Sequence, residues 1–440
     1  MDQPQVNIIG GGLAGCEAAH QCVRRGVKVR LHDMKPHKMS PAHESPHLAE
    51  LVCSNSFRSA EITSAVGLLK EEMRACHSLI METAGETAVP AGKALAVDRG
   101  RFAESITRYI DTHPLIERVH EEVTTLPPPS ASFTILATGP LTSEPLAAAL
   151  LNLTGAKGLS FYDAIAPIVS AESLNFDIIY QKSRYDDGPG DYLNCPMDEA
   201  AYRKFIDELG RAEYVPLAGF EEAKYFEGCL PVEVIRGRGD DTLRFGPMKP
   251  VGLPDPHTGR EPYAVVQLRK ENTEGSAYNM VGFQTKLTYT EQKRIFRMIP
   301  GMEHANFLRL GSIHRNTFVQ SPLLLAPTLQ FKARPDLLLA GQLSGVEGYV
   351  ESTAMGLLAG INAARLALGL QPAVPPPATA MGALIHHLID TEPRHFQPSN
   401  VNFSLFPPLG GKKIRKKFRG EERAKRGAEA LAQWLAAEGI

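Results

Sequence analysis

A glycine-rich turn near the N-terminus constrains this chain more than any other feature. VNIIG is a short apolar run, GGGLAG follows it, CEAAHQCVRRG has helical spacing, and VKVRLHD forms a second strand-like run. Within this unit Gly10, Gly12 and Gly15 make the pattern G-x-G-x-x-G. The three glycines serve a tight turn, close approach of the backbone to a pyrophosphate, and close packing of helix against strand. The unit therefore predicts an α/β fold that begins with a Rossmann-type dinucleotide site.

The surroundings of this pattern strengthen the prediction. A helix N-terminus supplies N–H groups and the positive end of a dipole to phosphates. Asp33 ends the second strand, where a carboxylate can hold a ribose hydroxyl. A glycine pattern alone is a weak signal and fits a turn without a ligand, but the full βαβ context with the acid is strong. The residues predicted to bind the dinucleotide are Gly10, Gly11, Gly12, Leu13, Ala14, Gly15 and Asp33.

Two later segments indicate which dinucleotide is bound. TILATG, residues 134–139, is a buried strand running into a glycine turn, and LLLAGQ, residues 337–342, is another strand followed by a helix. This layout resembles the glutathione-reductase-like FAD fold, in which a late strand and helix bring backbone amides to the flavin. An NAD-only dehydrogenase does not need the late element, no second G-x-G-x-x-G marks a nicotinamide domain, and the late element also argues against S-adenosylmethionine. The late motif adds Gly341, Gln342, Gly348 and Tyr349 to the predicted FAD site.

Loop composition predicts a discontinuous domain organisation. Residues 60–84 have a helical pattern, and residues 183–198 and 236–262 are rich in Gly, Pro and charge, as expected for loops or hairpins of an inserted domain. We expect an α+β insertion domain at 166–311, smaller than the FAD domain. The FAD domain is expected to comprise residues 1–90, 127–165 and 312–440, with 91–126 ambiguous.

Composition limits the cellular setting. No stretch approaches the roughly 18 apolar residues of a membrane span, and MDQPQVNIIGGG lacks the basic and apolar regions of a secretory signal. The six cysteines contain no C-x-x-C pair and form no disulfide framework. We therefore expect a cytoplasmic protein with reduced cysteines and no membrane contact.

One cysteine has unusual neighbours. In LVCSNSFRS, residues 51–59, Cys53 stands among small polar residues with Arg58 close by, and a nearby cation favours a thiolate. A packing role is the commoner fate of a cysteine. We expect it for Cys16 and Cys22 on the first helix, whereas Cys76 and Cys195 carry no signal. A flavin disulfide oxidoreductase is disfavoured because Cys53 has no closely spaced partner.

Five motifs carry a more specific resemblance over most of the chain. IIGGGLAGCEAA, HDMKP, LAELVCSNSFRS, FEGCLPVEV and LLLAGQLSGVEGYVES occur in the expected order and resemble the TrmFO family of folate- and FAD-dependent tRNA uracil-5-methyltransferases. The first motif is shared with the larger GidA/MnmG flavoproteins, whereas SNSFRS and EGCLP point to TrmFO. The resemblance implies FAD, 5,10-methylenetetrahydrofolate as methylene donor, and NADH or NADPH as reductant. It implies that the T-loop uridine of tRNA is converted into 5-methyluridine.

The resemblance also implies roles for individual residues. Cys229 would attack uracil C6, and Cys53 would be a second thiol beside the flavin that assists proton removal from C5 or guards the flavin. The chemistry needs such a thiol, because uracil C5 is a poor nucleophile until a thiolate adds to C6. His314 would stack on the pterin, although a lone histidine is more often structural. Arg58 is the candidate cation at the substrate site.

A basic segment near the C-terminus is the candidate tRNA contact. GKKIRKKFRGEERAKR, residues 411–426, has nine Lys/Arg and two Glu, so the rest of a chain of net charge −2 is acidic. A solvated face is the usual explanation, but phosphate neutralisation fits a polyanionic substrate. Two other functions stay open: a non-catalytic FAD- and RNA-binding protein, and a GidA/MnmG-like wobble-uridine modifier, for which the chain is short. No obligatory protein partner is expected. The predicted tRNA-contacting residues are Lys412, Lys413, Arg415, Lys416, Lys417 and Arg419.

Overall fold

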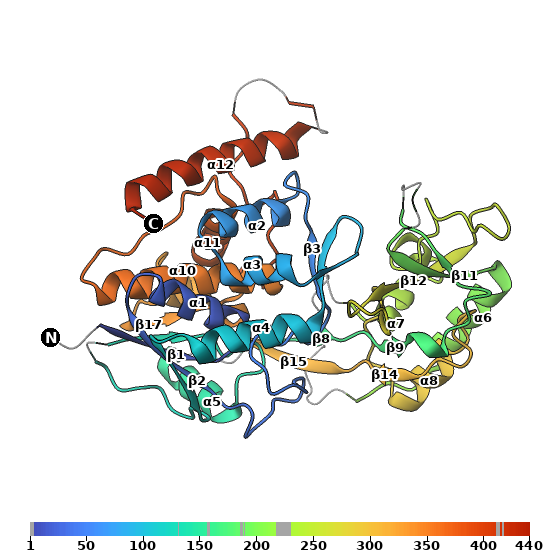
Figure 1. Cartoon of the computed structure of the whole chain (residues 1–440), viewed down its shortest axis with the longest axis horizontal. Helices are drawn as coiled ribbons and strands as arrows, with labels where there is room; N and C mark the ends of the chain where they lie inside the picture. Colours follow the sequence, from blue (N-terminus) through green and yellow to red (C-terminus); the bar gives the residue numbers. More distant parts are fainter. Residues whose placement is uncertain are drawn as a thin grey trace.

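A computed structural model shows two bodies, each with its own sheet and hydrophobic core (Figure 1). The larger body holds both ends of the chain, and the smaller one is built from the middle of the sequence. The model describes residues 4–130, 132–155, 159–184, 188, 190–216, 230–410, 414–415 and 418–440, with the backbone alone for 159–163, 314 and 315.

A six-stranded sheet organises the larger body. All neighbouring strands are parallel except the edge pair β16–β17, and the order β16-β17-β7-β1-β2-β6 brings the late strand β17 next to β7 and β1. The βαβ unit is present as predicted, with β2 ending at Asp33. The predicted FAD-type α/β fold is therefore confirmed. The strands are β1 (Gln5–Ile9), β2 (Lys28–Asp33), β6 (Ile116–His120), β7 (Phe133–Leu136), β16 (Gln330–Phe331) and β17 (Arg334–Leu339).

Two helices that are far apart in the sequence pack closely against each other and against this sheet. A Cβ added to Gly356 of α10 (Tyr349–Ala367) would lie 2.2 Å from the Ala14 carbonyl oxygen of α1 (Leu13–Val23). A Cβ at Gly360 would lie 2.6 Å from the carbonyl oxygen of Ala18. Only glycine allows this approach, and every residue of α1 is buried. The two contacts set the middle of α10 alongside the first half of α1, with both helices running in the same direction.

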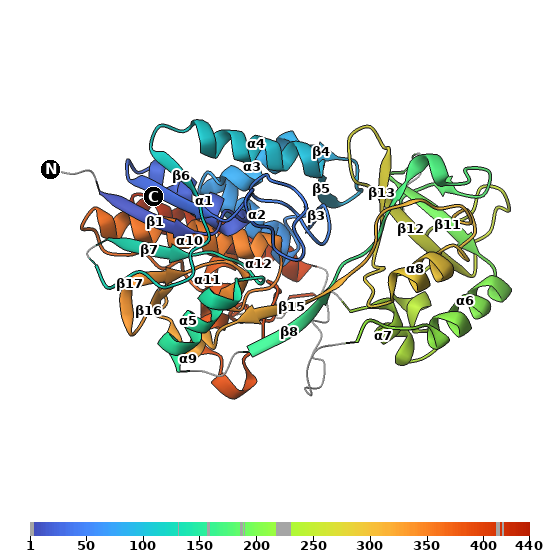
Figure 2. The same cartoon turned by 90° about the horizontal axis from the view of Figure 1, so that it is seen from below.

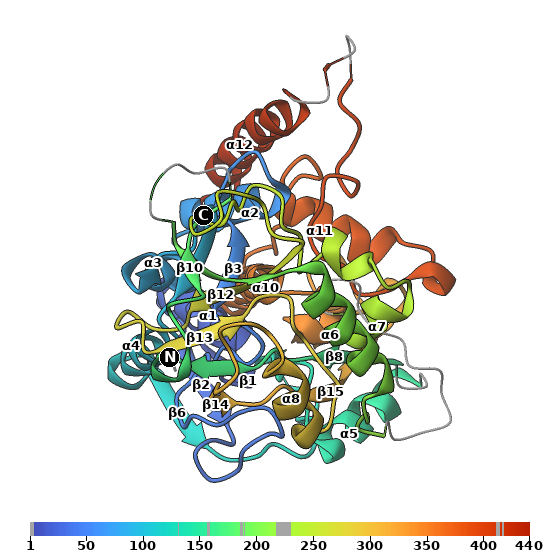
Figure 3. The ribbon, with the colours of Figure 1, turned by 90° about the vertical axis from the view of Figure 1, so that its right-hand side faces the viewer.

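The smaller body is an antiparallel sheet covered by helices (Figure 3). Its strand order is β10-β11-β12-β13-β9-β14, and its core includes Tyr202, Phe205, Phe283 and Phe296. Its strands are β9 (Ile168–Ser170), β10 (Tyr180–Gln181), β11 (Tyr192–Met197), β12 (Ala264–Lys270), β13 (Ala277–Met280) and β14 (Phe307–Arg309); its helices are α6 (Glu199–Arg211), α7 (Val232–Gly237) and α8 (Tyr289–Phe296).

A two-stranded antiparallel ribbon joins the two bodies (Figure 2). It consists of β8 (Leu159–Ala164) and β15 (Ile313–Phe318). The ambiguous residues 91–126 lie with the larger body, since α4 (Arg99–Thr112) packs on α3 and β6 pairs with β2. We propose the ribbon as the boundary of the insertion domain, in line with the range 166–311.

The segment 60–84 is not one continuous helix. It contains α2 (Ala65–Ala75) and α3 (Leu79–Glu86), because His77 has a positive φ of 57° and the Ser78 hydroxyl accepts the Met81 N–H to start a new helix. The tail is helical as expected, with α11 (Ala380–Asp390) and α12 (Arg419–Glu438). Within the described ranges, none of the helices combines the length and apolar character needed to cross a membrane. The remaining elements are β3 (Ser56–Ser59), β4 (Ala88–Val89), β5 (Ala94–Val97), α5 (Glu144–Thr154) and α9 (Ser321–Leu324).

Candidate functional site

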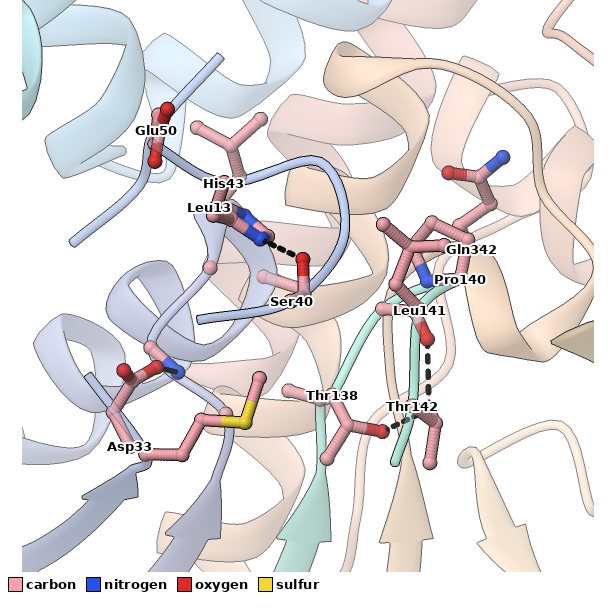
Figure 4. Close-up of a pocket in the computed structure, with 18 of the residues that line it drawn as sticks. Leu13, Asp33, Ser40, His43, Glu50, Thr138, Pro140, Leu141, Thr142 and Gln342 are labelled. Atoms are coloured by element: carbon pink, nitrogen blue, oxygen red, sulfur yellow. Dashed lines mark hydrogen bonds between the residues drawn. The ribbon is translucent and has the colours of Figure 1, made fainter. Parts of the chain in front are cut away.

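A cavity lies at the carboxyl ends of β1, β2, β7 and β17 (Figure 4). Its volume is about 1350 Å³, including the solvent space at its entrance. Ligands of open α/β sheets bind at this edge. Nine of the eleven predicted FAD-binding residues line the cavity, and the other two, Gly15 and Gly348, lie beside it in the chain. The tertiary structure thus brings the early and late motifs to one site. The nine lining residues are Gly10, Gly11, Gly12, Leu13, Ala14, Asp33, Gly341, Gln342 and Tyr349.

The three motif glycines differ in the space that surrounds the position of a Cβ atom. Gly10 has a φ of +109°, and a Cβ there would lie 2.5 Å from the Ala137 carbonyl oxygen. A Cβ at Gly15 would lie 1.8 Å from the Gly10 carbonyl oxygen, so this glycine closes the turn against the helix. A Cβ at Gly12 would meet no atom within 4 Å. Gly12 therefore leaves room beside the backbone, which close approach of a phosphate requires.

The chain presents an acid and uncapped helix starts to the cavity. Asp33 Oδ2 accepts the Gly11 N–H at 2.7 Å and Oδ1 accepts the Lys35 N–H at 2.8 Å, which fixes the carboxylate at the end of β2. Gly12 and Gly348 precede α1 and α10, and no side chain caps either helix. Their first N–H groups and dipoles suit an anion. These residues fit the ribose and pyrophosphate of FAD.

A polar cluster that the sequence did not reveal lines the same cavity (Figure 4). The Ser40 hydroxyl lies 2.5 Å from His43 Nδ1, and Lys35 Nζ lies 3.9 Å from Glu50 Oε2. Burial lowers the pKa of Lys35 and of His43. The segment 40–50 has no hydrophobic periodicity, so only the fold shows that these side chains meet. The motif HDMKP, which contains Lys35, is the one signal that pointed toward them.

Cys53 reaches this cavity together with Gln342 and Tyr349. Its residue is half-buried, whereas Cys16, Cys22, Cys76 and Cys195 are buried. Burial raises the pKa of each of these four thiols, so they are poor nucleophiles. The packing role expected for Cys16 and Cys22 is confirmed.

The cation predicted to assist Cys53 has an acidic partner. Arg58 forms an ion pair with Glu351, which is fully buried on α10. Arg99, at the start of α4, also lies near the thiol: its Nη1 is 3.5 Å from the Val52 carbonyl oxygen, and its charge interacts with Cys53. Burial lowers the pKa of Arg99, but the neighbouring carboxylate of Glu271 and smaller contributions from Tyr349 and Cys53 outweigh it, so the net pKa is raised. Arg99 is therefore a permanent positive charge near the thiol, and the sequence offered no signal for it.

Comparison with known proteins identifies the chain. Residues 5–371 match the family model of glucose inhibited division protein A. The chain is 67% identical to the methylenetetrahydrofolate--tRNA-(uracil-5-)-methyltransferase TrmFO of Desulfotalea psychrophila, over 98% of this chain and 97% of that protein. It is 59% identical to the TrmFO of Geobacter sulfurreducens, over 98% and 99%.

The chain belongs to the TrmFO family.

The solved structure of Aquifex aeolicus GidA shares this fold. It matches with a TM-score of 0.70 and 17% identity, over 98% of this chain and 74% of that chain. At this identity the likeness concerns the fold, whereas the family assignment rests on the TrmFO relatives. The resemblance inferred from SNSFRS and EGCLP is thereby confirmed.

The structure describes some of the predicted TrmFO residues only in part and others not at all. Cys229, Lys412, Lys413, Lys416 and Lys417 lie outside the described residues. The backbone of His314 lies in β15 opposite Asp163, in the ribbon that also contributes Asn316 to the cavity wall. Arg415 and Arg419 are exposed, and Arg419 Nε donates to the Ile414 carbonyl at 3.2 Å.

Proposed function

We propose that this TrmFO chain transfers the one-carbon unit of 5,10-methylenetetrahydrofolate to C5 of the T-loop uridine of tRNA, using FAD and NADH or NADPH. The observation that carries the proposal is the meeting of Cys53 with the glycine turn, Gln342 and Tyr349 in one cavity. FAD, when bound there, supplies the reducing equivalents that turn a methylene group into a methyl group.

The two thiols are proposed to divide the work on the uracil. Cys229 adds to C6, which makes C5 nucleophilic, and Cys53 assists removal of the C5 proton or protects the flavin. Cys53 is suited to this task because it lines the cavity and lies near the positive charge of Arg99. Arg58 is proposed to act at the substrate site from its ion pair with Glu351.

The pterin of the folate is proposed to stack on His314. The supporting observation is that β15, which carries His314, contributes Asn316 to the wall of the cavity. Replacement of His314 by Ala is expected to weaken folate use more than NADH oxidation. Equal losses in both reactions would contradict stacking.

The basic segment is proposed to bind tRNA phosphates. The start of α12 packs near the loop that follows β3, since a Cβ at Gly420 would lie 2.3 Å from the Thr63 carbonyl oxygen. Strand β3 in turn begins at Ser56, shortly after Cys53. Figure 1 shows α12 along the outer side of α2, and the two helices pack against each other. Phosphates held at exposed Arg415 and Arg419 would thus run beside the element that leads to the thiol. The target uridine must leave its stack to reach the cavity.

A labelled-methylene transfer assay tests the proposal. Purified protein with FAD, NADH or NADPH and an unmodified tRNA transcript receives label either from methylenetetrahydrofolate or from S-adenosylmethionine. Label in T-loop 5-methyluridine from the folate alone is the expected result. Absence of transfer from either donor, with FAD bound, would contradict the proposal.

The wobble-uridine alternative is not favoured by the TrmFO relatives, which match this chain over almost their whole length. Analysis of the product separates the two reactions, because an aminomethyl group at the wobble base would replace 5-methyluridine. A cytoplasmic location and the absence of an obligatory protein partner stay predictions of the sequence.

A further inference from the structure

The insertion domain holds the loop that carries Cys53. Arg269, near the end of β12, reaches across to this loop with two donors: Nη2 lies 2.8 Å from the Ser54 hydroxyl and Nε lies 3.0 Å from Asn55 Oδ1. The loop also donates a hydrogen bond to the insertion domain, from Asn55 Nδ2 to the Lys270 carbonyl at 2.8 Å. The same amide donates to the Val97 carbonyl at 2.9 Å, so Asn55 connects both bodies.

Two further guanidinium groups converge on the preceding peptide. Arg309, the last residue of β14, donates from Nη1 to the Val52 carbonyl at 2.9 Å and from Nη2 to the Ala42 carbonyl at 3.1 Å. Arg99 approaches the same Val52 carbonyl at 3.5 Å. The residues on both sides of Cys53 are therefore held by side chains from the insertion domain.

Packing alone does not explain Arg269. The residue is only 6% exposed. Within its own domain the guanidinium interacts with Tyr192 and with the carboxylate of Glu271, whereas both of its contacts in the loop are to neutral groups. A buried guanidinium is costly, and a hydrophobic residue of similar volume often serves stability as well or better. The directed bonds to Ser54 and Asn55 instead fix the orientation of the peptide next to Cys53. A fixed reacting group is what a catalytic site requires, since small misplacements reduce rates strongly.

We propose that Arg269 is a positioning residue, through which the insertion domain sets the placement of the Cys53 thiol in the cavity. Its consequence for catalysis rests on the proposed function, whereas its consequence for the thiol does not. Arg309 supports the same loop from the same domain.

Site-resolved alkylation of the FAD-loaded protein tests this inference. Iodoacetamide is added without tRNA or folate, and the modification of each cysteine is followed by peptide mass spectrometry. In Arg269→Gln we expect Cys53 to react at least threefold faster, because its loop is released toward solvent. The four buried cysteines should stay protected, since the domain cores are unchanged. They are Cys16, Cys22, Cys76 and Cys195.

Arg297→Gln is the control. Arg297 is an exposed arginine of the insertion domain, and both of its hydrogen bonds go to the Ala305 carbonyl within that domain. This variant should alkylate Cys53 at the wild-type rate. Ser54→Ala removes one acceptor of Arg269 with a small side-chain change, and it should give a smaller rise of the same sign. It keeps the inference testable where Arg269→Gln does not fold.

Turnover provides the second measurement. Arg269→Gln should lower kcat for methyl transfer at least tenfold, with KM for tRNA within twofold of the wild type. An unchanged Cys53 alkylation rate in Arg269→Gln and Ser54→Ala would overturn the inference. A parallel rise at Cys53 and at the four buried cysteines would also overturn it, because Arg269 would then only support the fold. A wild-type protein that transfers no methyl group would refute the proposed function but leave the alkylation result valid.

Discussion

The Tyr349 hydroxyl accepts a hydrogen bond of 2.7 Å from the backbone N–H of Cys53, although 296 positions separate the two residues. It also accepts the Ser54 N–H at 3.2 Å. Tyr349 is the first residue of α10, so this bond ties the thiol loop to the helix that faces the glycine turn. Burial raises the pKa of Tyr349 well above its ordinary value, with a further contribution from Cys53, and the hydroxyl stays neutral.

Replacement of Tyr349 by Phe tests this link. The change removes the acceptor of two N–H groups, and an unsatisfied buried donor costs about 1–3 kcal/mol. We expect a lower melting temperature and faster alkylation of Cys53. Tyr289→Phe, at a residue that is 59% exposed, is the control and should change neither. Equal stability of Tyr349→Phe and wild type would show that water replaces the hydroxyl.

Two glycine substitutions should separate folding from cofactor binding. Gly15→Ala places a methyl group against the Gly10 carbonyl and should destabilise the apoprotein by roughly 2 kcal/mol or more. Gly12→Ala has room in the protein, so the melting temperature of the apoprotein should stay near the wild-type value. Its flavin absorbance per protein should nevertheless fall after gel filtration, because the methyl group occupies the space of a phosphate. Full flavin retention in Gly12→Ala would contradict close approach at this glycine.

Acid should weaken the larger body through His20. Nε2 of this residue donates to the His77 carbonyl at 3.0 Å, so Nδ1 is the acceptor of the Tyr109 hydroxyl at 2.7 Å. Burial lowers the pKa of His20 from 6.5 to about 4. The unfolded chain therefore binds more protons between these values, and the contribution of His20 to stability is lost as the pH falls from about 6.5 to about 4.

His20→Gln can keep both hydrogen bonds and does not titrate. The melting temperature of the wild type should fall more steeply than that of the variant as the pH is lowered from about 6.5 toward about 4. Well above this range the difference between the two proteins should be constant. Parallel curves through the acid range would show that His20 is not responsible.

Removal of the two thiols one at a time tests their proposed roles. Cys229→Ala should abolish methyl transfer while FAD stays bound, because nothing else adds to uracil C6. Cys53→Ala should also lose methyl transfer but leave the attack at C6 possible, so it should still trap tRNA carrying 5-fluorouridine as a covalent complex. An active, flavin-loaded Cys229→Ala enzyme would contradict the assignment of the nucleophile.

The basic segment should give tRNA binding its salt dependence. Replacing Lys412, Lys413, Lys416 and Lys417 by Ala should weaken binding and reduce the slope of log K against log salt concentration by roughly 0.7–0.9 for each phosphate that the segment no longer neutralises. Arg415→Ala should weaken binding in the same direction. Arg211→Ala, at a strongly exposed arginine of the insertion domain, removes one charge elsewhere and is its control. An unchanged affinity and slope in the lysine variant would exclude the segment as the tRNA contact.

The sequence by itself determined the parts of the site that depend on local pattern. The spacing of Gly10, Gly12 and Gly15 between two strand-like runs set the dinucleotide turn, and Asp33 at the end of β2 followed from the same unit. The late motif at Gly341 indicated the FAD type of fold. Periodicity and glycine spacing are properties of neighbouring residues, so they can be read without coordinates.

Only the tertiary structure decided which residues surround Cys53. Arg58, the nearest cation in the sequence, pairs with Glu351, whereas Arg99 and Arg269 approach the thiol loop from α4 and from the insertion domain. These arginines occur in segments whose local pattern is that of an ordinary helix start and strand. Arg99 meets the loop because α4 packs within the larger body, and Arg269 meets it because the second sheet is docked beside that body across the ribbon. The partners of a side chain therefore depend on tertiary packing rather than on sequence distance.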